Sequence, residues 1–282
     1  MLKLDEIGLW SEIKLEIIRK YASAFTRIMK NRPWCRGYAY IDAFAGAGMH
    51  ISRKTGEFVL GSSLNALEIE NPFTEYHFID IDKGKAATLE ELTHERPNIM
   101  IYPEDCNDAL LGKIFPSLKY ETKKRALCVL DPYGLHLHWH TIYEAAKLGT
   151  IEIFLNFPIM DMNRNVLYKD LTSANSDQIE RMNRFCGTKD WQQILYEENP
   201  QKYLFQDWGG SYRVKVVHAN IKLSKWFKTE RLENAAGFEF VPEPVLMRNS
   251  KGGPLYFLFF ASHNQTGPRI VNDIFGKYRG YQ

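Results

Sequence analysis

Short apolar segments alternate with segments of helical length over the first 158 residues, and this alternation limits the possible folds more than any other feature. The apolar segments, predicted as strands, are 37–43, 75–81, 98–102, 125–130 and 151–157. The segments predicted as helices are 10–28, 62–70, 83–96, 107–118 and 141–148, and 49–61 is predicted as an insertion that contains a turn. Strands that alternate with helices predict an α/β fold, in which helices cover both faces of a parallel sheet.

The pattern changes after about residue 160. Helices predicted over 176–186 and 189–198 are followed by a segment at 212–223, a β-hairpin over 245–261 and a helix over 268–278. We therefore expect two domains, 1–160 with the parallel sheet and 161–282 as a smaller α+β region. Residues 213–282 contain eleven Lys and Arg against five Asp and Glu, although the whole chain has a net charge of only +2. A basic C-terminal region fits a nucleic-acid contact surface, and it fits a solvated lysine-rich face equally well.

The composition, 45% hydrophobic and 25% charged, is that of a globular protein. The most apolar runs, 151–158 and 254–261, have eight residues each. A membrane-spanning helix needs roughly 20. Acidic residues near the N-terminus interrupt the apolar segment that a signal peptide needs. The four cysteines lie far apart in the sequence, which suits isolated thiols in a reducing compartment. We expect a cytoplasmic protein without a membrane span or a disulfide scaffold.

The segment Tyr40-Ile-Asp-Ala-Phe-Ala-Gly-Ala-Gly48 is the most informative motif. A strand ends in Asp42, and Gly46 and Gly48 follow on the turn into a helix, where they allow a ligand to approach the backbone. The third glycine of a dinucleotide fingerprint is absent, because position 51 is Ile. An acid beside a glycine turn suits a ligand with a cationic amino-acid moiety, and S-adenosylmethionine is the candidate. An ordinary strand–turn–helix corner is the alternative.

Acidic residues also follow the next two predicted strands. Asp80 comes at the end of 75–81, where a carboxylate can accept hydrogen bonds from both ribose hydroxyls, and Asp82 either takes this role instead or caps the next helix. Asp105 follows 98–102 and can accept a hydrogen bond from an adenine amino group. Ligands of open α/β sheets bind at the carboxyl ends of the strands, so these acids are predicted to line one site.

The fourth strand ends in Asp131-Pro-Tyr-Gly134. Asp131 and a backbone carbonyl can accept both hydrogens of an exocyclic amine, which turns the nitrogen lone pair toward a methyl donor. Tyr133 offers an aromatic face on which a base taken out of its helix can stack. The alternative is a β-turn in which Pro132 and Gly134 occupy positions that turns favour.

Three histidines alternate just after this motif, at positions 136, 138 and 140. On an extended segment they would face one way, as metal ligands do. No acidic or cysteine partner stands nearby in the sequence, so solvent-facing or substrate-facing histidines are favoured over a metal site.

These motifs resemble those of class I S-adenosylmethionine-dependent methyltransferases over about residues 35–158. The whole chain resembles the bacterial three-Cys-motif partner family, on the opening helix and on the segments Tyr40-Ile-Asp-Ala-Phe-Ala-Gly, Leu130-Asp-Pro-Tyr-Gly, Asn156-Phe-Pro158 and Met247-Arg-Asn-Ser-Lys-Gly-Gly-Pro-Leu-Tyr256. The family takes its name from gene association with a cysteine-motif protein of the radical S-adenosylmethionine kind, which the resemblance implies as a partner. It also implies a Rossmann-like methyltransferase sheet and a winged-helix-like C-terminal region.

The resemblance assigns roles to residues at the strand ends. It implies that Asp42, Phe44, Gly46 and Gly48 contact the methionine end of the cofactor, that Asp80 or Asp82 holds the ribose and Asp105 the adenine, and that Asp131, Pro132 and Tyr133 face the methyl acceptor. Two features depart from the family pattern. The insertion 49–61 leaves the choice between Asp80 and Asp82 open, and Tyr-Gly after Asp-Pro does not identify adenine as the substrate.

The first functional hypothesis is therefore a methyltransferase that acts on an exocyclic amine of a base in DNA or RNA. The second is a module with the same fold but no chemistry, which binds nucleic acid or a partner protein through 177–282. In that module Arg248 and Lys251, which flank the hairpin turn, would contact phosphates. A third keeps the cofactor and changes the acceptor to a protein or a small molecule.

Overall fold

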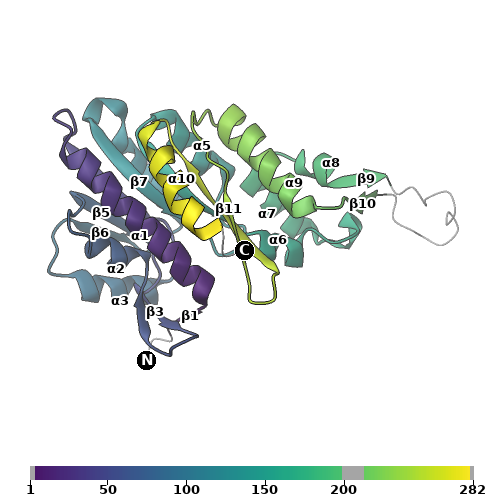
Figure 1. Ribbon diagram of the computed structural model, residues 1–282, viewed down its shortest axis with the longest axis horizontal. Helices are drawn as coiled ribbons and strands as arrows, with labels where there is room; N and C mark the ends of the chain where they lie inside the picture. Colours follow the sequence, from purple (N-terminus) through teal and green to yellow (C-terminus); the bar gives the residue numbers. More distant parts are fainter. Residues whose placement is uncertain (1–3, 199–212, 280–282) are drawn as a thin grey trace, which may run out of the picture.

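A seven-stranded sheet forms the centre of the protein in the computed structural model, which describes residues 4–198 and 213–279 (Figure 1). Its strands are β2 (Gly37–Asp42), β5 (Glu75–Ile79), β6 (Ile99–Tyr102), β7 (Lys124–Leu130), β8 (Ile151–Phe157), β11 (Val245–Arg248) and β12 (Pro254–Ala261). They lie in the order β11-β12-β8-β7-β2-β5-β6, and the five strands from β8 to β6 are parallel. The predicted parallel sheet is confirmed.

The order of the parallel strands creates a crevice. The chain runs outward from β2 to β5 and β6, and then returns to the other side of β2 to form β7 and β8. The loops after β2 and β7 therefore leave the sheet in opposite directions, as they do at the switch point of doubly wound folds. Every acid that the sequence singled out lies at the carboxyl-end edge of these strands.

The C-terminal hairpin belongs to this same sheet. Strand β12 runs antiparallel to β8, with Phe257 opposite Phe157, and β11 pairs antiparallel with β12. The winged-helix-like C-terminal region is therefore not confirmed. Residues on both sides of the division expected between 160 and 161 contribute strands to one continuous sheet. The apolar run 254–261 is buried beside β8 and extends its apolar surface.

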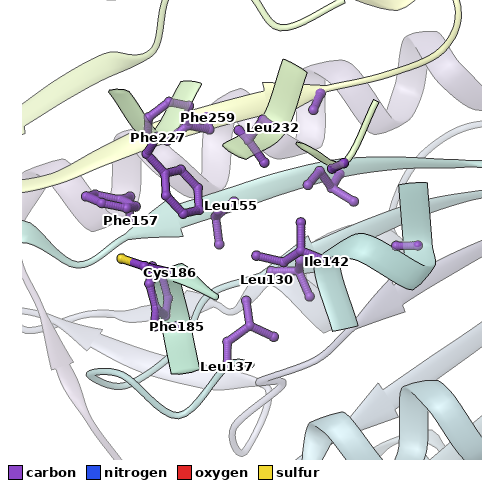
Figure 2. Close-up of a cluster of buried hydrophobic side chains, with 14 of the residues drawn as sticks. Leu130, Leu137, Ile142, Leu155, Phe157, Phe185, Cys186, Phe227, Leu232 and Phe259 are labelled. Atoms are coloured by element: carbon purple, nitrogen blue, oxygen red, sulfur yellow. The ribbon is translucent and has the colours of Figure 1, made fainter. Parts of the chain in front are cut away.

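Two apolar layers hold the helices on the sheet. On one face lie α1 (Leu9–Lys30), α2 (Ser62–Leu67), α3 (Lys83–Thr93) and α10 (Thr266–Arg279), and α1 and α10 run side by side there (Figure 1). On the other lie α4 (Cys106–Ala109), α5 (Trp139–Leu148), α7 (Ser176–Cys186) and α9 (Ala219–Trp226). Figure 2 shows the second layer, where Leu155, Phe157 and Phe259 of the sheet face Phe185 and Phe227. Burial of each large apolar side chain contributes about 1.5–3 kcal/mol, so both layers hold the strands and their end loops in place.

The predicted insertion 49–61 forms a hairpin beside the carboxyl-end edge. Strands β3 (Met49–Ser52) and β4 (Phe58–Leu60) pair antiparallel, and β1 (Glu6–Ile7) adds in parallel to β3. Gly61 donates a backbone hydrogen bond of 2.7 Å to the carbonyl of Gly48, which closes the hairpin against the glycine turn. The insertion thus lies next to the predicted cofactor site.

The remaining elements are short. They are α6 (Ile159–Asn165), α8 (Trp191–Leu195), β9 (Tyr196–Glu198) and β10 (Arg213–Lys215), with π-helical turns at Leu110–Ile114 and Phe227–Ala235 and 3₁₀ turns at Phe115–Leu118, Tyr120–Thr122 and Leu171–Ser173. The helix predicted over 189–198 ends at Leu195, and the start of the segment predicted at 212–223 lies outside the described residues. In the described part of the chain, no helix combines the length and apolarity needed to span a membrane.

Candidate active site

The glycine turn after β2 leaves room for a ligand. Gly46 and Gly48 have φ of +62° and +81°, which side chains with a Cβ rarely adopt. Gly46 is buried, yet a Cβ at this position would have no heavy atom within 4 Å. At Gly48 a Cβ would instead lie 2.8 Å from Leu89, so this glycine allows the turn to pack against α3. The turn therefore combines a packed end with an open one, and this fits a bound group at Gly46.

Asp42 lies beneath this turn with no exposed surface. One oxygen accepts a hydrogen bond of 3.3 Å from the backbone N–H of Phe44, and the other accepts one from the hydroxyl of Ser62. Burial raises the pKa of Asp42 to about 7, and these two hydrogen bonds oppose the shift. The carboxyl group thus holds the turn directly, and a cation bound above the turn would favour its ionised form.

The structure separates the roles of Asp80 and Asp82. Asp80 Oδ2 accepts a hydrogen bond of 2.9 Å from the backbone N–H of Gly46, so its carboxylate lies at the open end of the glycine turn. Asp82 is exposed, and it caps α3 by accepting bonds from the N–H groups of Gly84 and Lys85. Of the two candidates for the ribose ligand, only Asp80 contacts the glycine turn.

Asp105 caps α4 and is joined to the acceptor loop through Asn107. Its Oδ1 accepts bonds from the backbone N–H of Asn107 at 2.8 Å and from the Asn107 side chain at 3.0 Å. Asn107 is 3% exposed, donates to the carbonyl of His136 and accepts from the N–H of His138. The loops after β6 and β7 are therefore held at a fixed separation.

Asp131 has two partners that the sequence motifs did not predict. The ammonium group of Lys14, on α1, forms an ion pair with Asp131 Oδ2, and the amide of Asn156, at the end of β8, donates to Oδ1. The Lys14 side chain is 10% exposed and that of Asp131 28%. Lys14 also lies 5.3 Å from the centroid of the Tyr256 ring. The cation of Lys14 therefore lies directly against the carboxyl group of Asp131 at the end of β7.

Asn156 presents a further acceptor at the same place. Its Oδ1 is buried and has no hydrogen-bond partner among the described residues, while its amide group is held on Asp131. A buried polar atom without a partner is costly, so this oxygen is available for a hydrogen bond from a ligand.

Pro132 and Tyr133, which follow Asp131, differ in exposure. Pro132 is buried and Tyr133 is 56% exposed. The ammonium group of Lys85, at the start of α3, lies 5.5 Å from the Tyr133 ring centroid and forms a 2.7 Å ion pair with Asp5. The aromatic face next to Asp131 therefore lies close to the loop that carries Asp80.

The hairpin tip with Arg248 and Lys251 lies at this same edge of the sheet. Since β12 runs antiparallel to β8, the turn before β12 lies beyond the carboxyl end of β8. Arg248 donates to the carbonyl of Gly252 at 2.9 Å, and Lys251 is exposed. Both cations therefore stand on the same side of the molecule as Asp131.

The alternating histidines separate in the structure. His136 and His140 are exposed, whereas His138 is half-buried and precedes the first turn of α5. Within residues 4–198 and 213–279, no three His, Cys, Asp or Glu side chains form a group that could hold a metal ion.

Sequence reasoning missed Lys14, Asn107, Asn156 and His50. His50, on β3, has a buried Nδ1 without a partner among the described residues, and burial together with the charge of Lys14 lowers its pKa. Lys14 lay within an amphipathic pattern that predicted only a packed helix. Asn156 was part of the Asn-Phe-Pro resemblance, which was the one signal available for it.

The chain is similar to several solved structures at low sequence identity. Protein LPL1258 from Legionella pneumophila str. Philadelphia 1, of family model DUF519, is 10% identical, with 95% of this chain and 92% of that chain covered and a TM-score of 0.51. A putative S-adenosylmethionine-dependent methyltransferase from Listeria monocytogenes is 11% identical over 87% of this chain and 99% of that chain, with a TM-score of 0.39. The 23S rRNA methyltransferase ErmE is 16% identical over 68% and 64%, with a TM-score of 0.29.

The likeness to LPL1258 shows a shared fold, and the two lower scores add nothing to that conclusion. With its strand order, the chain has a Rossmann-like α/β fold. No protein-family model and no curated protein matches the sequence. The three-Cys-motif partner family is therefore not shown.

Proposed function

We propose that this protein is an S-adenosylmethionine-dependent methyltransferase that methylates an exocyclic amine of a nucleic-acid base. The observation that carries the proposal is the hydrogen bond from the N–H of Gly46 to Asp80, because it brings the glycine turn and the ribose-binding candidate together at the switch point of the sheet. The open space at Gly46 supports a ligand there.

The residues at this turn fit the parts of the cofactor. S-adenosylmethionine supplies an activated methyl group on a sulfonium ion when it is bound. Asp42, Phe44, Gly46 and Gly48 would hold its methionine end, with Asp42 as the anionic group below the turn. Asp80 would hold the ribose, since each of its oxygens accepts one backbone N–H and retains a lone pair.

Asp105 would hold the adenine amino group. Its Oδ1 bonds Asn107, and no hydrogen bond engages its Oδ2 within the described part of the chain. Asp82, which caps α3, would take no part in binding.

The acceptor side would orient an amine by hydrogen bonds alone. Lys14 and the amide of Asn156 hold the carboxyl group of Asp131 in place, and Asn156 Oδ1 adds a second acceptor beside it, so two amine hydrogens can be held at once. The amine nitrogen then directs its lone pair away from both acceptors. The carbonyl of Pro132 is an alternative second acceptor, and the exposed ring of Tyr133 would stack on the base. Catalysis on this account is mainly positioning, so no general base is required.

A nucleic-acid acceptor is supported by charge at the same edge. Arg248 and Lys251 lie at the tip of the hairpin, two strands away from β7, at the edge where Asp131 lies. Phosphates that flank an extruded base would contact them, while the base itself would reach Tyr133.

The alternative is a binding module without chemistry, for nucleic acid or for a partner protein such as the radical S-adenosylmethionine-like protein that the resemblance implies. One observation favours it: both oxygens of Asp131 already have protein partners. In such a module the Lys14–Asp131 pair would be structural. Binding would then be indifferent to S-adenosylmethionine.

Calorimetric titration with S-adenosylmethionine tests the cofactor site. We expect saturable binding by the wild type and a loss of at least about tenfold in Asp80→Ala, since this change removes a charged hydrogen-bond partner. Asp82→Ala is the matched control, because it removes a helix cap at a cost of about 1 kcal/mol in stability and should leave binding intact. A well-folded wild type that does not bind the cofactor would favour the binding module.

Methyl transfer to DNA and RNA, followed with a labelled methyl group, tests the acceptor side. Asp131→Asn should lower turnover without weakening cofactor binding. Asn156→Leu should do the same if its Oδ1 holds the amine. Transfer that is unaffected by both changes would contradict the proposed acceptor geometry.

A further inference from the structure

A cavity of about 180 Å³ lies at the amino ends of β7 and β8, at the edge of the sheet opposite the candidate active site. Phe25 and Met29 of α1 form an apolar wall, and Trp34, which is 42% exposed, stands beside them. Arg125 and Glu152 add charged groups. An apolar cavity of about 150 Å³ in another protein admits benzene, so a space of this size takes a small organic molecule.

Glu152 brings to this cavity a buried acid that forms no ion pair with a residue of the described part of the chain. It is 7% exposed, and its oxygens accept hydrogen bonds from the hydroxyls of Tyr21 and Ser262. No Lys, Arg or His nitrogen of the described residues lies within 4.0 Å of it. Burial raises the pKa of Glu152 to about 7, although the hydrogen bonds from Tyr21 and Ser262 and the more distant charge of Arg125 oppose this shift. A ligand cation would give Glu152 the ion-pair contact that it lacks.

Arg125 brings the opposite charge to the same cavity. Its guanidinium lies 4.5 Å from the ring centroid of Trp34 and 5.2 Å from that of Tyr120, and its Nη1 donates to the carbonyl of Lys124. In the described part of the chain, no carboxylate lies within 4.0 Å of it. An Arg guanidinium has several N–H donors in a planar fork, which suits a carboxylate.

The two charges face the cavity from neighbouring strands. Leu127 is opposite Glu152 in the β7–β8 ladder, and Arg125 precedes Leu127 by two residues on the same face of the sheet. The spacing between strands and the rise along a strand place the Cα atoms of Arg125 and Glu152 about 8 Å apart. This separation leaves room for a molecule that carries both charges.

We propose that this cavity binds a small zwitterion with an apolar side chain, and that a free α-amino acid is the chemical class that fits. Glu152 holds the ammonium group and Arg125 the carboxylate. The side chain lies against Phe25, Met29 and Trp34. The site is separate from the proposed methyl-transfer site and does not depend on it.

Three probes of one shape test the charge requirement: L-leucine, 3-methylbutylamine, which lacks the carboxylate, and 4-methylpentanoate, which lacks the amine. We expect calorimetry on the full-length protein to show saturable binding of L-leucine. Binding of either single-charge analogue should be at least about tenfold weaker. Intrinsic tryptophan fluorescence, to which Trp34 at the cavity contributes, gives a second readout.

Two substitutions assign the charges. Glu152→Gln should weaken binding of L-leucine and 3-methylbutylamine at least about tenfold and leave that of 4-methylpentanoate unchanged. Arg125→Gln should weaken binding of L-leucine and 4-methylpentanoate at least about tenfold and leave that of 3-methylbutylamine unchanged. Glu95→Gln, whose side chain is 87% exposed, is the control. If Glu152→Gln folds poorly, Arg125→Gln still decides, since this side chain contributes to no buried hydrogen-bond network. No saturable L-leucine binding at millimolar concentration, or binding that survives both changes, would overturn the proposal.

Discussion

The two edges of the central sheet each hold a buried acid with a pKa of about 7, Asp42 at the carboxyl ends of the strands and Glu152 at the amino ends. At the first edge, Asp42 stands under a glycine turn and its neighbour Asp131 is paired with Lys14. At the second, Glu152 has hydroxyl partners alone in the described part of the chain. The sequence therefore predicted a functional acid at the first edge, Asp42, but did not indicate the buried acid at the second. A glycine turn marks its acid locally, whereas the partners of Glu152 come from distant segments.

The largest expected effect tests the charge pairing at the carboxyl-end edge. Lys14→Met should lower the free energy of unfolding by about 2–3 kcal/mol, because it leaves the partly buried Asp131 without its cation. Urea unfolding measures this. Lys20→Met, in the same helix, is the control, since its pair with Glu16 is exposed and should contribute at most about 0.5 kcal/mol.

The double variant Lys14→Met with Asp131→Asn should recover part of that loss, because it removes the unpaired charge. Equal losses in the free energy of unfolding for Lys14→Met and Lys20→Met would show that the Lys14–Asp131 pair stabilises the protein no more than an exposed ion pair does.

The next effect concerns pH and compares the two buried acids directly. Both folded-state pKa values lie above the usual values near 4, so between about pH 4 and 7 the folded protein retains protons that the unfolded chain releases. Stability therefore falls as pH rises through this window, by roughly 1 kcal/mol per pH unit for each group, and levels off above pH 7.

Asp42→Asn and Glu152→Gln should each remove the contribution of one acid to this pH dependence. The stability of either variant relative to the wild type should therefore increase from pH 5 to pH 8. Urea midpoints at both pH values measure the gain. With saturating S-adenosylmethionine, the gain of Asp42→Asn should shrink, since the cofactor favours the ionised acid, while that of Glu152→Gln should stay. Identical responses to the cofactor would remove the distinction between the edges.

The smallest effect compares two glycines. Gly46 and Gly149 have φ of +62° and +65°, and a Cβ at either would have no heavy atom within 4 Å. Replacement by alanine should cost about 1 kcal/mol of stability at each, because the left-handed backbone is strained by a Cβ. Only Gly46→Ala should weaken binding of S-adenosylmethionine, as calorimetry would show. An equal loss of S-adenosylmethionine binding in Gly149→Ala would show that backbone strain, and not a contact at the glycine turn, causes the effect.

Local patterns predicted most of the elements. Strand 151–157 agrees with β8 residue for residue, and the opening helix, predicted over 10–28, is α1 over Leu9–Lys30. Such elements follow from periodicity within one segment. The hairpin 245–261 was also recognised, but its place in the main sheet was not, because strand pairing over a long sequence separation leaves no local trace.

The candidate site shows the same division. Asp80, Asp105 and Tyr133 were predicted as site residues because each follows a strand, and parallel strands bring their carboxyl ends to one edge of the sheet. Lys14 and Asn107 were missed, since a lysine on an amphipathic helix and an asparagine in a first helical turn are ordinary in sequence. Their partners, Asp131 and the backbone at His136 and His138, are supplied by other elements.

The sequence by itself determined the parallel α/β sheet, the glycine turn and the acids at the strand ends, because these depend on residue type and spacing within short segments. Tertiary structure decided that Asp80 rather than Asp82 meets the glycine turn, that Lys14 pairs with Asp131, and that the C-terminal hairpin completes the sheet. It also brought Glu152 and Arg125 to one cavity at the far edge. These outcomes depend on which distant surfaces pack together, and burial, which sets the pKa values and the unpaired atoms, exists only once they have done so.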